Sequence, residues 1–141
     1  MSYLLDTNVV SEWTRPRPDP AVIAFLASTS EDLLFLSVIT LGELRRGVDR
    51  LPAGRRRAAL DDWLNNDLVL RFGPRILGID HDVASAWGRI MAQAERRGRT
   101  HGVMDVWIAA IAEVHGLTLV TRNVTDFELV LSRIFNPRDP A

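Results

Sequence analysis

The most constraining feature of this sequence is a series of short apolar runs that alternate with longer segments of helical spacing. The runs are YLLD at 3–6, DLLFLSV at 32–38, ILGI at 76–79, LTLVT at 117–121 and a weaker one, RIFN, at 133–136. None shows the polar alternation of a strand with one wet face, so we interpret each as a strand buried on both sides. Such strands, separated by helices, predict an α/β fold in which helices cover both faces of a parallel sheet.

The segments between these runs supply the helices. We expect helices at 7–14, 20–28, 39–51, 53–71, 81–98 and 102–116. Gly98 and Gly116 stand at the ends of the last two, where glycine commonly terminates a helix. With 141 residues, no internal repeat and no long linker, the chain is expected to form one domain over residues 1–141.

Composition excludes several classes of protein. The chain has no cysteine, which removes disulfide frameworks and thiolate metal sites. The N-terminus lacks the pattern of a signal peptide, because the acidic residue Asp6 ends its short apolar run. The longest apolar stretch, around 102–112, is too short to cross a bilayer. We therefore expect a cytoplasmic protein without a membrane partner.

The basic residues are unusual in kind and in distribution. The net charge is −1, which gives no global attraction to nucleic acid, but all seventeen basic residues are arginine. They cluster at 45–50, 55–57 and 96–99. Arginine suits phosphate because its planar fork donates two hydrogen bonds. The alternative is that each cluster is an ordinary solvated helix face.

Two aspartates stand where a charge is costly. Asp6 ends the first apolar run, and Asp105 is the only charged side chain between Gly102 and Ala112. A carboxylate in such surroundings needs a cation, a metal or several hydrogen-bond donors. A purely structural interpretation is open for each. Asp6 would then be the N-cap of the following helix, and Asp105 a first-turn acid favoured by the helix dipole.

Two further acids also carry two interpretations. Glu43 ends a capping-box pattern, TLGE at 40–43, in which it would bond back to a backbone N–H. Asp126 lies in turn-forming sequence beside a second such pattern, TDFE at 125–128. Asn123 stands just before it, and both follow a predicted strand.

Taken together, these acids indicate a metal site. In open α/β sheets, functional side chains gather at the carboxyl ends of the strands, which is where Asp6 and Asp126 fall. Carboxylates brought to one rim repel each other unless a cation neutralises them. Oxygen ligands without cysteine suit Mg²⁺ or Mn²⁺. Such ions activate water for phosphodiester cleavage, so the acids favour a nuclease.

The same motifs, in the same order, resemble a known family. LLDTNVVSE at 4–12, LSVITLGELRRGV at 36–48, HGVMDVWIAAIAEVHGLTLVTRNVTDF at 101–127 and IFNP at 134–137 are similar to PIN-domain ribonucleases of the VapC toxin type, from type II toxin–antitoxin pairs. The resemblance implies a PIN-like three-layer α/β/α sandwich with a parallel sheet of four or five strands. It also implies RNA as the substrate, Mg²⁺ or Mn²⁺ as the cofactor, a VapB-like cognate antitoxin and a homodimer.

The resemblance assigns roles to particular residues. Asp6, Glu43 and Asp105 match the family's three acidic positions, with Asp6 and Asp105 as the implied metal ligands and Glu43 completing the cluster. Some relatives carry an aspartate where this chain has Asn123, whose amide oxygen can accept a hydrogen bond but brings no charge. Either Asp126 supplies the fourth acid, or a fourth acid is dispensable.

Two rival functions remain open at this point. The chain could be a PIN-like module that binds a partner or RNA without cutting. It could also be a phosphatase of the haloacid-dehalogenase type, because YLLDTN resembles an apolar strand that ends on a nucleophilic aspartate. That chemistry needs a second acid two residues later, and Asn8 occupies the position.

Overall fold

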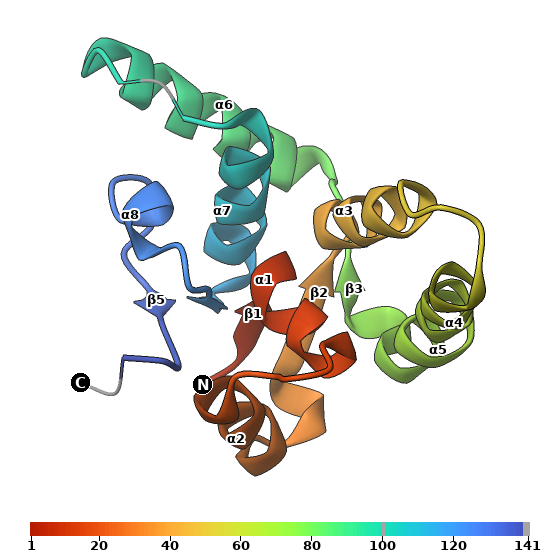
Figure 1. The fold of residues 1–141 in the computed structure, drawn as a ribbon. Helices are drawn as coiled ribbons and strands as arrows, with labels where there is room; N and C mark the ends of the chain where they lie inside the picture. The colour runs from red at the N-terminus through yellow and green to blue at the C-terminus, as the bar shows by residue number, and fades with distance from the viewer. Residues whose placement is uncertain (100, 140–141) are drawn as a thin grey trace.

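A five-stranded parallel sheet forms the centre of the computed structural model, which describes residues 1–99 and 101–139 (Figure 1). The strands are β1 (Tyr3–Leu5), β2 (Leu34–Ser37), β3 (Ile76–Leu77), β4 (Thr118–Val120) and β5 (Ile134–Phe135), in the spatial order β3-β2-β1-β4-β5. In register, Leu4 lies opposite Phe35 on one side and Leu119 on the other. All four pairings are parallel, which confirms the predicted α/β class.

Helices connect the strands. They are α1 (Thr7–Val10), α2 (Pro20–Ser28), α3 (Val38–Asp49), α4 (Arg55–Trp63), α5 (Val69–Phe72), α6 (His81–Arg96), α7 (Val103–His115) and α8 (Val124–Phe127). Short 3₁₀ segments lie at Ser11–Thr14, Glu31–Leu33 and Gly73–Arg75, and a π-helical segment lies at Leu64–Leu68. Gly98 and Gly116 have positive φ angles just after α6 and α7, as predicted for helix ends.

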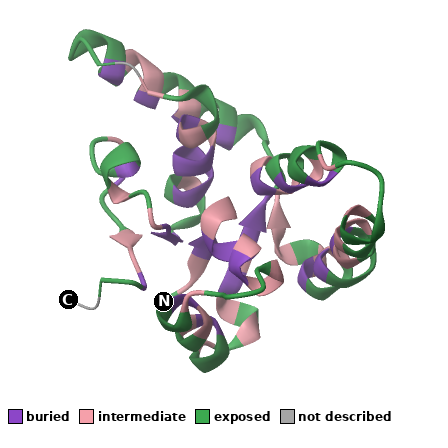
Figure 2. Cartoon of the chain, in the orientation of Figure 1, coloured by how far each residue is buried: buried purple, intermediate pink, exposed green. Residues whose placement is uncertain are grey.

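Successive residues of the central strand point into two separate cores. Leu4 packs with the buried faces of α6 and α7, whereas Leu5 packs with α1, α2, α3 and α5. The same alternation holds in β4, where Leu119 joins the first core and Val120 the second. Figure 2 shows most of the three central strands buried, the edge strands β3 and β5 half-buried and the outer surfaces of the helices exposed. The sheet is therefore covered on both faces, which is why its strands lack polar alternation.

The structure corrects some predicted boundaries. The predicted helix at 53–71 is helical but not uniform, because the π-helical segment separates α4 from α5. The predicted strand at 76–79 keeps only Ile76 and Leu77. The short helix α8 was not predicted and replaces the turn expected before Asp126.

None of the helices within residues 1–99 and 101–139 has both the length and the apolar character that crossing a bilayer requires.

Candidate active site

The candidate site lies at the carboxyl ends of β1 and β4, the two strands between which the direction of the chain through the sheet reverses. Such a reversal leaves a crevice, because the connections that follow the two strands go to opposite faces. Here α1 follows β1 to one core and α8 follows β4 to the other. Asp6 stands at the end of β1, and its backbone N–H donates to the Val120 carbonyl over 2.9 Å.

Asp6 is a buried carboxylate with two close hydrogen-bond donors. Its side chain is held by the Thr7 backbone N–H, 2.8 Å from Oδ1, and by Thr121 Oγ1, which donates to Oδ2 over 2.7 Å. Asp6 is only 6% exposed. It is the N-cap of α1, so the structural interpretation of Asp6 is confirmed. The capping bond leaves Oδ2 on the side of β4, where the other polar groups lie.

Burial dominates the electrostatics of Asp6. Removal from water raises the pKa of Asp6 from 3.8 to about 6, against the opposing effect of the bonds from Thr121 and Thr7. The charges of Glu43 and Asp105 contribute to this rise, after burial. Three acids from three separate segments are thus close enough to influence one another.

Glu43 reaches the site from α3. Its Oε1 accepts a hydrogen bond of 2.6 Å from Thr7 Oγ1, the residue directly after Asp6. The capping-box interpretation of Glu43 is wrong, because α3 begins at Val38 and Ser37 caps it by accepting from the Thr40 N–H over 3.0 Å. Glu43 therefore lies in the second turn, too far along the helix to bond back to its cap.

Asp105 enters the site from the first turn of α7, as its structural interpretation expected. It is half-buried, and its side chain forms no capping bond with the described part of the helix. Burial raises the pKa of Asp105, and the charges of Asp126 and then Glu43 raise it further, whereas His101 lowers it. The net effect of these surroundings is to favour the neutral form of Asp105.

Asp126 and Asn123 differ in what they contribute. Asp126 lies in the first turn of α8 and, with Asp105, lines a hollow of about 410 Å³. Asn123 is the N-cap residue of α8, but its side chain makes no capping bond; its backbone N–H donates to Thr121 Oγ1 over 3.0 Å. The capping box at 125–128 is wrong, because the helix already begins at Val124.

Polar residues that the sequence analysis did not select hold this site together. Asn8 Nδ2 lies 3.4 Å from Asp6 Oδ2 and 3.3 Å from Thr121 Oγ1, and Asn8 Oδ1 accepts from the Arg122 N–H over 3.2 Å. Thr121 is fully buried at the end of a strand, where a hydroxyl requires partners. The sequence signal that could have identified Thr121 is its position, because it is the polar residue that follows the predicted strand LTLV.

A buried ion pair lies next to these residues. Glu12 is 1% exposed, and its Oε1 accepts from the Asp19 backbone N–H over 3.1 Å and lies 3.5 Å from Arg122 Nη1. Its Oε2 lies 3.3 Å from Arg15 Nε. Glu12 therefore ties the segment after α1 to the segment after β4, on either side of Asp6.

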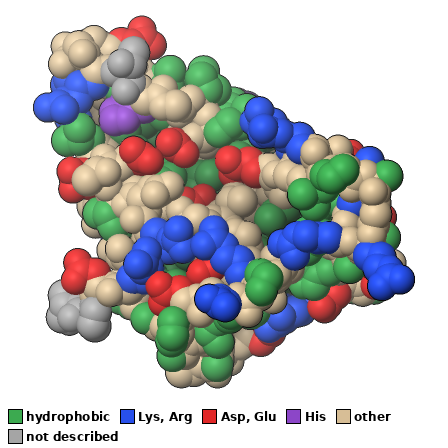
Figure 3. Space-filling view, viewed as in Figure 1, with side chains coloured by type: hydrophobic (Ala, Val, Ile, Leu, Met, Phe, Trp, Pro, Cys, Tyr) green, Lys and Arg blue, Asp and Glu red, His purple; other side chains and the backbone are tan. Residues whose placement is uncertain are grey.

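The donor set fits a hard divalent cation held by few protein ligands. No ion pair joins Asp6, Glu43, Asp105 or Asp126 to a basic side chain within the described residues. Across residues 1–99 and 101–139, no three acidic or histidine side chains converge closely enough to enclose a metal. Mg²⁺ commonly binds one or two carboxylates and retains waters, so an open arrangement suits it. Figure 3 shows acidic side chains gathered on this face, with basic ones beside them.

Comparisons with known proteins agree with this geometry. The sequence matches the PIN domain family over residues 3–130. It is 38% identical to VapC ribonuclease Y4jK of Sinorhizobium fredii over 98% of this chain and 99% of that protein. It is 39% identical to Toxin FitB of Neisseria gonorrhoeae over 95% of this chain and 96% of the toxin.

Solved structures give the same result. The crystal structure of FitAcB from Neisseria gonorrhoeae superimposes with a TM-score of 0.92 at 38% identity, over 98% of this chain and 99% of that one. The structure of FitAB bound to the IR36 DNA fragment gives 0.93 at 35% identity, over 99% and 97% of the two chains.

Proposed function

The chain belongs to the PIN-domain family, and on this premise we propose that it is a metal-dependent endoribonuclease, the toxin of a toxin–antitoxin pair. The observation that carries the proposal is that four carboxylates from four separate elements lie at one end of the sheet, each close enough to another to affect a pKa. They come from the end of β1, from α3, from α7 and from α8. Among the four, only Asp6 forms a helix-capping bond in the part of the chain that the structure describes.

Asp6 and Asp105 are the proposed metal ligands, and Glu43 and Asp126 add negative charge around them. A bound Mg²⁺ or Mn²⁺ would activate the attacking water and stabilise the charge that develops on the phosphodiester. The chain fixes its own ligands in place. Thr121 and the Thr7 N–H hold the Asp6 carboxylate, and the Thr7 hydroxyl holds Glu43.

The raised pKa of Asp6 supports a role that needs a cation. With a pKa of about 6, Asp6 is ionised at neutral pH only against an unfavourable environment. A divalent ion at this position would stabilise the ionised form and offset the repulsion among the acids. The same applies to Asp105, whose pKa is also raised by burial and by neighbouring carboxylates.

An antitoxin partner is part of the proposal. Relatives of this chain have been solved as the FitAcB complex and as FitAB bound to a DNA fragment. We propose a VapB-like antitoxin for this chain, with a segment that places an arginine among the acids, because a guanidinium would neutralise the charges that otherwise attract metal. We also propose a homodimer that acts in the cytoplasm, where its RNA substrate lies.

The test is RNA cleavage by the purified protein, freed of any antitoxin. Total bacterial RNA is incubated with Mg²⁺, with Mn²⁺ or with EDTA, using wild type, Asp6→Asn, Asp105→Asn and, as a matched control, Asp62→Asn on the exposed face of α4. We expect discrete fragments from wild type and the control with metal only. Binding of RNA or antitoxin without cleavage under any condition would instead support the alternative, a PIN-like module that does not cut.

A further inference from the structure

The three arginine clusters of the sequence have different surroundings in the structure. In the first cluster, Arg45 is already engaged, because its guanidinium contacts Asp49 over 3.2 Å, Asp61 over 2.6 Å and Asn65 over 2.7 Å. Such an arginine has few donors left for a ligand. The first cluster is therefore partly structural.

The third cluster lies beside the acids. Arg99 lines the hollow of about 410 Å³ that also contains Asp105 and Asp126. A second, smaller hollow of about 100 Å³ adjoins it and is lined by Arg97 from the end of α6. The two hollows share Arg99, His101 and Leu129, so they lie next to each other between the acids and α6, and together they are called the cleft below.

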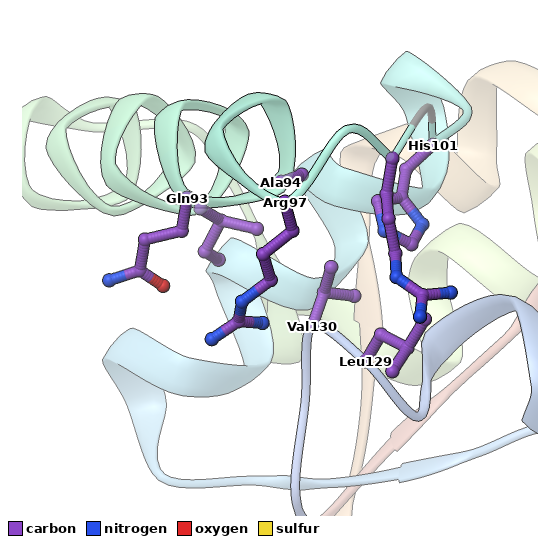
Figure 4. A pocket seen from close by; sticks show the side chains of 8 residues that line it. Gln93, Ala94, Arg97, His101, Leu129 and Val130 are labelled. Carbon is purple, nitrogen blue, oxygen red and sulfur yellow. The ribbon is translucent and has the colours of Figure 1, made fainter.

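The close-up of the smaller hollow shows how its walls are built (Figure 4). Arg97 extends from the end of α6 beside Val130, Gln93 lies on the far side of Arg97, and His101 lies at the other end, near Leu129. Its lining combines the apolar side chains of Ile90, Ala94, Leu129 and Val130 with polar and basic ones. Such a lining can bind a nucleic-acid strand, because apolar side chains can contact its flat bases and basic side chains can contact its charged phosphates.

Arg97 and Arg99 are exposed, and neither guanidinium forms an ion pair or a hydrogen bond with any side chain that the structure describes. Six other arginines of the chain are paired with carboxylates in that same set: Arg15, Arg45, Arg71, Arg75, Arg122 and Arg138. Two unpaired cations next to a cluster of acids would attract a polyanion to the rim while the acids exclude it from the centre without metal.

We propose that this cleft, defined by Gln93, Arg97, Arg99, His101 and Leu129, binds the single-stranded RNA that leads to the acids, with its phosphates on Arg97 and Arg99. This proposal rests on the nuclease function proposed above and adds the path of the substrate. RNA is favoured over an acidic peptide because the cleft adjoins the acids proposed to cleave a phosphodiester, and because Leu129 and Val130 in its lining can contact a base.

The test is RNA binding in EDTA, which does not depend on cleavage. A fluorescent single-stranded RNA 12-mer of mixed sequence is titrated by anisotropy at several salt concentrations. The proteins are wild type, the double variant Arg97→Gln/Arg99→Gln and the control Arg55→Gln/Arg56→Gln, which makes the same charge change on the remote helix α4. Circular dichroism confirms that each variant is folded.

We expect the double variant to bind at least about tenfold more weakly and to lower the slope of log affinity against log salt by about 1.4, since each phosphate contact on a single strand contributes about 0.7. The control should stay within about twofold of wild type. Equal losses in both variants, or none in either, would overturn the proposal, as would equally tight binding of a polyglutamate 12-mer, which would indicate a protein partner.

The two proposals fail in different ways. If the double variant loses RNA binding but wild type cuts nothing with Mg²⁺ or Mn²⁺, the cleft stands and the nuclease function falls. If wild type cuts RNA and the double variant binds it as the control does, the nuclease function stands and the cleft is not the path of the strand.

Discussion

Thr121 Oγ1 donates a hydrogen bond of 2.7 Å to Asp6 Oδ2, joining the ends of two neighbouring strands 115 residues apart in the sequence. The same hydroxyl oxygen accepts from the Asn123 N–H and contacts Asn8 Nδ2. A single hydroxyl thus links Asp6 to both segments that border the crevice. The bond favours the ionised form of a carboxylate that burial disfavours.

Removal of that hydroxyl should change the pH dependence of cleavage. In Thr121→Val the pKa of Asp6 should rise further above 6, because a bond to the ionised form is lost. The acidic limb of the pH–rate profile should therefore move to higher pH, and slightly acidic samples should lose the most activity. Thr118→Val in β4, the strand that Thr121 follows, is the matched control, since its side chain makes no bond to Asp6. An identical shift in both variants would contradict this account.

The raised pKa of Asp6 should make the metal-free protein less stable as pH rises. Between its unfolded pKa of 3.8 and its folded pKa of about 6, the folded protein binds more protons than the unfolded chain. The free energy of unfolding should therefore fall as pH rises through this window, by about 3 kcal/mol from Asp6 alone. Comparison with Asp6→Asn by denaturant titration at each pH isolates the effect, because the variant does not titrate at this position.

In that comparison, wild type should lose stability relative to Asp6→Asn between pH 4 and pH 7. Added Mg²⁺ or Mn²⁺ should restore stability to wild type at pH 7 by mass action, and less to the variant. A difference between the two proteins that is constant with pH would show that Asp6 has an ordinary pKa.

Mutation can distinguish the contributions of Asp126 and Asn123 to RNA cleavage. Asp126 influences the pKa of Asp105 more than Glu43 does, whereas Asn123 uses its backbone to hold Thr121. We predict that Asp126→Asn lowers the rate of RNA cleavage about tenfold, as expected for a supporting charge of about 1.4 kcal/mol. Asn123→Ala should change the rate less than threefold. The reverse order would assign the fourth position to the amide.

The buried Glu12 should matter for stability. Glu12→Gln keeps the shape but removes the charge that faces Arg122 and Arg15, and we expect a loss of about 2 kcal/mol in the free energy of unfolding. Glu31→Gln is the matched control, because its pairs with Arg71 and Arg75 are partly exposed and should contribute less than about 1 kcal/mol. Chemical denaturation of both variants checks this, and equal losses would argue against the burial of Glu12.

The strands could be predicted because a strand that is buried on both faces has an uninterrupted run of apolar residues. Leu4 and Leu5 enter opposite cores, so the run has no polar member until the strand ends at Asp6. The helix ends at Gly98 and Gly116 were also predictable, because both glycines have positive φ. These features depend on local geometry and on the burial of single elements.

The contacts between elements could not be predicted in the same way. Both Ser37 and Thr40 are good capping residues, and the sequence alone does not choose between them. The fold selects Ser37 as the cap, because the side chains of Thr40 and Glu43 instead contact Thr7, which lies in a distant part of the chain. Likewise, the arginine clusters look alike in sequence, and only the fold brings Asp61 of α4 to Arg45.

The central claim is that Asp6 and Asp105 bind a divalent ion, and Mn²⁺ binding tests it most directly. Electron paramagnetic resonance of free Mn²⁺ would be recorded during titration with wild type, Asp6→Asn, Asp105→Asn and the exposed control Asp62→Asn at pH 7.5. The account predicts that wild type and the control bind Mn²⁺ with the same affinity and that each site variant binds at least about tenfold more weakly. Undiminished binding in both site variants would contradict the account.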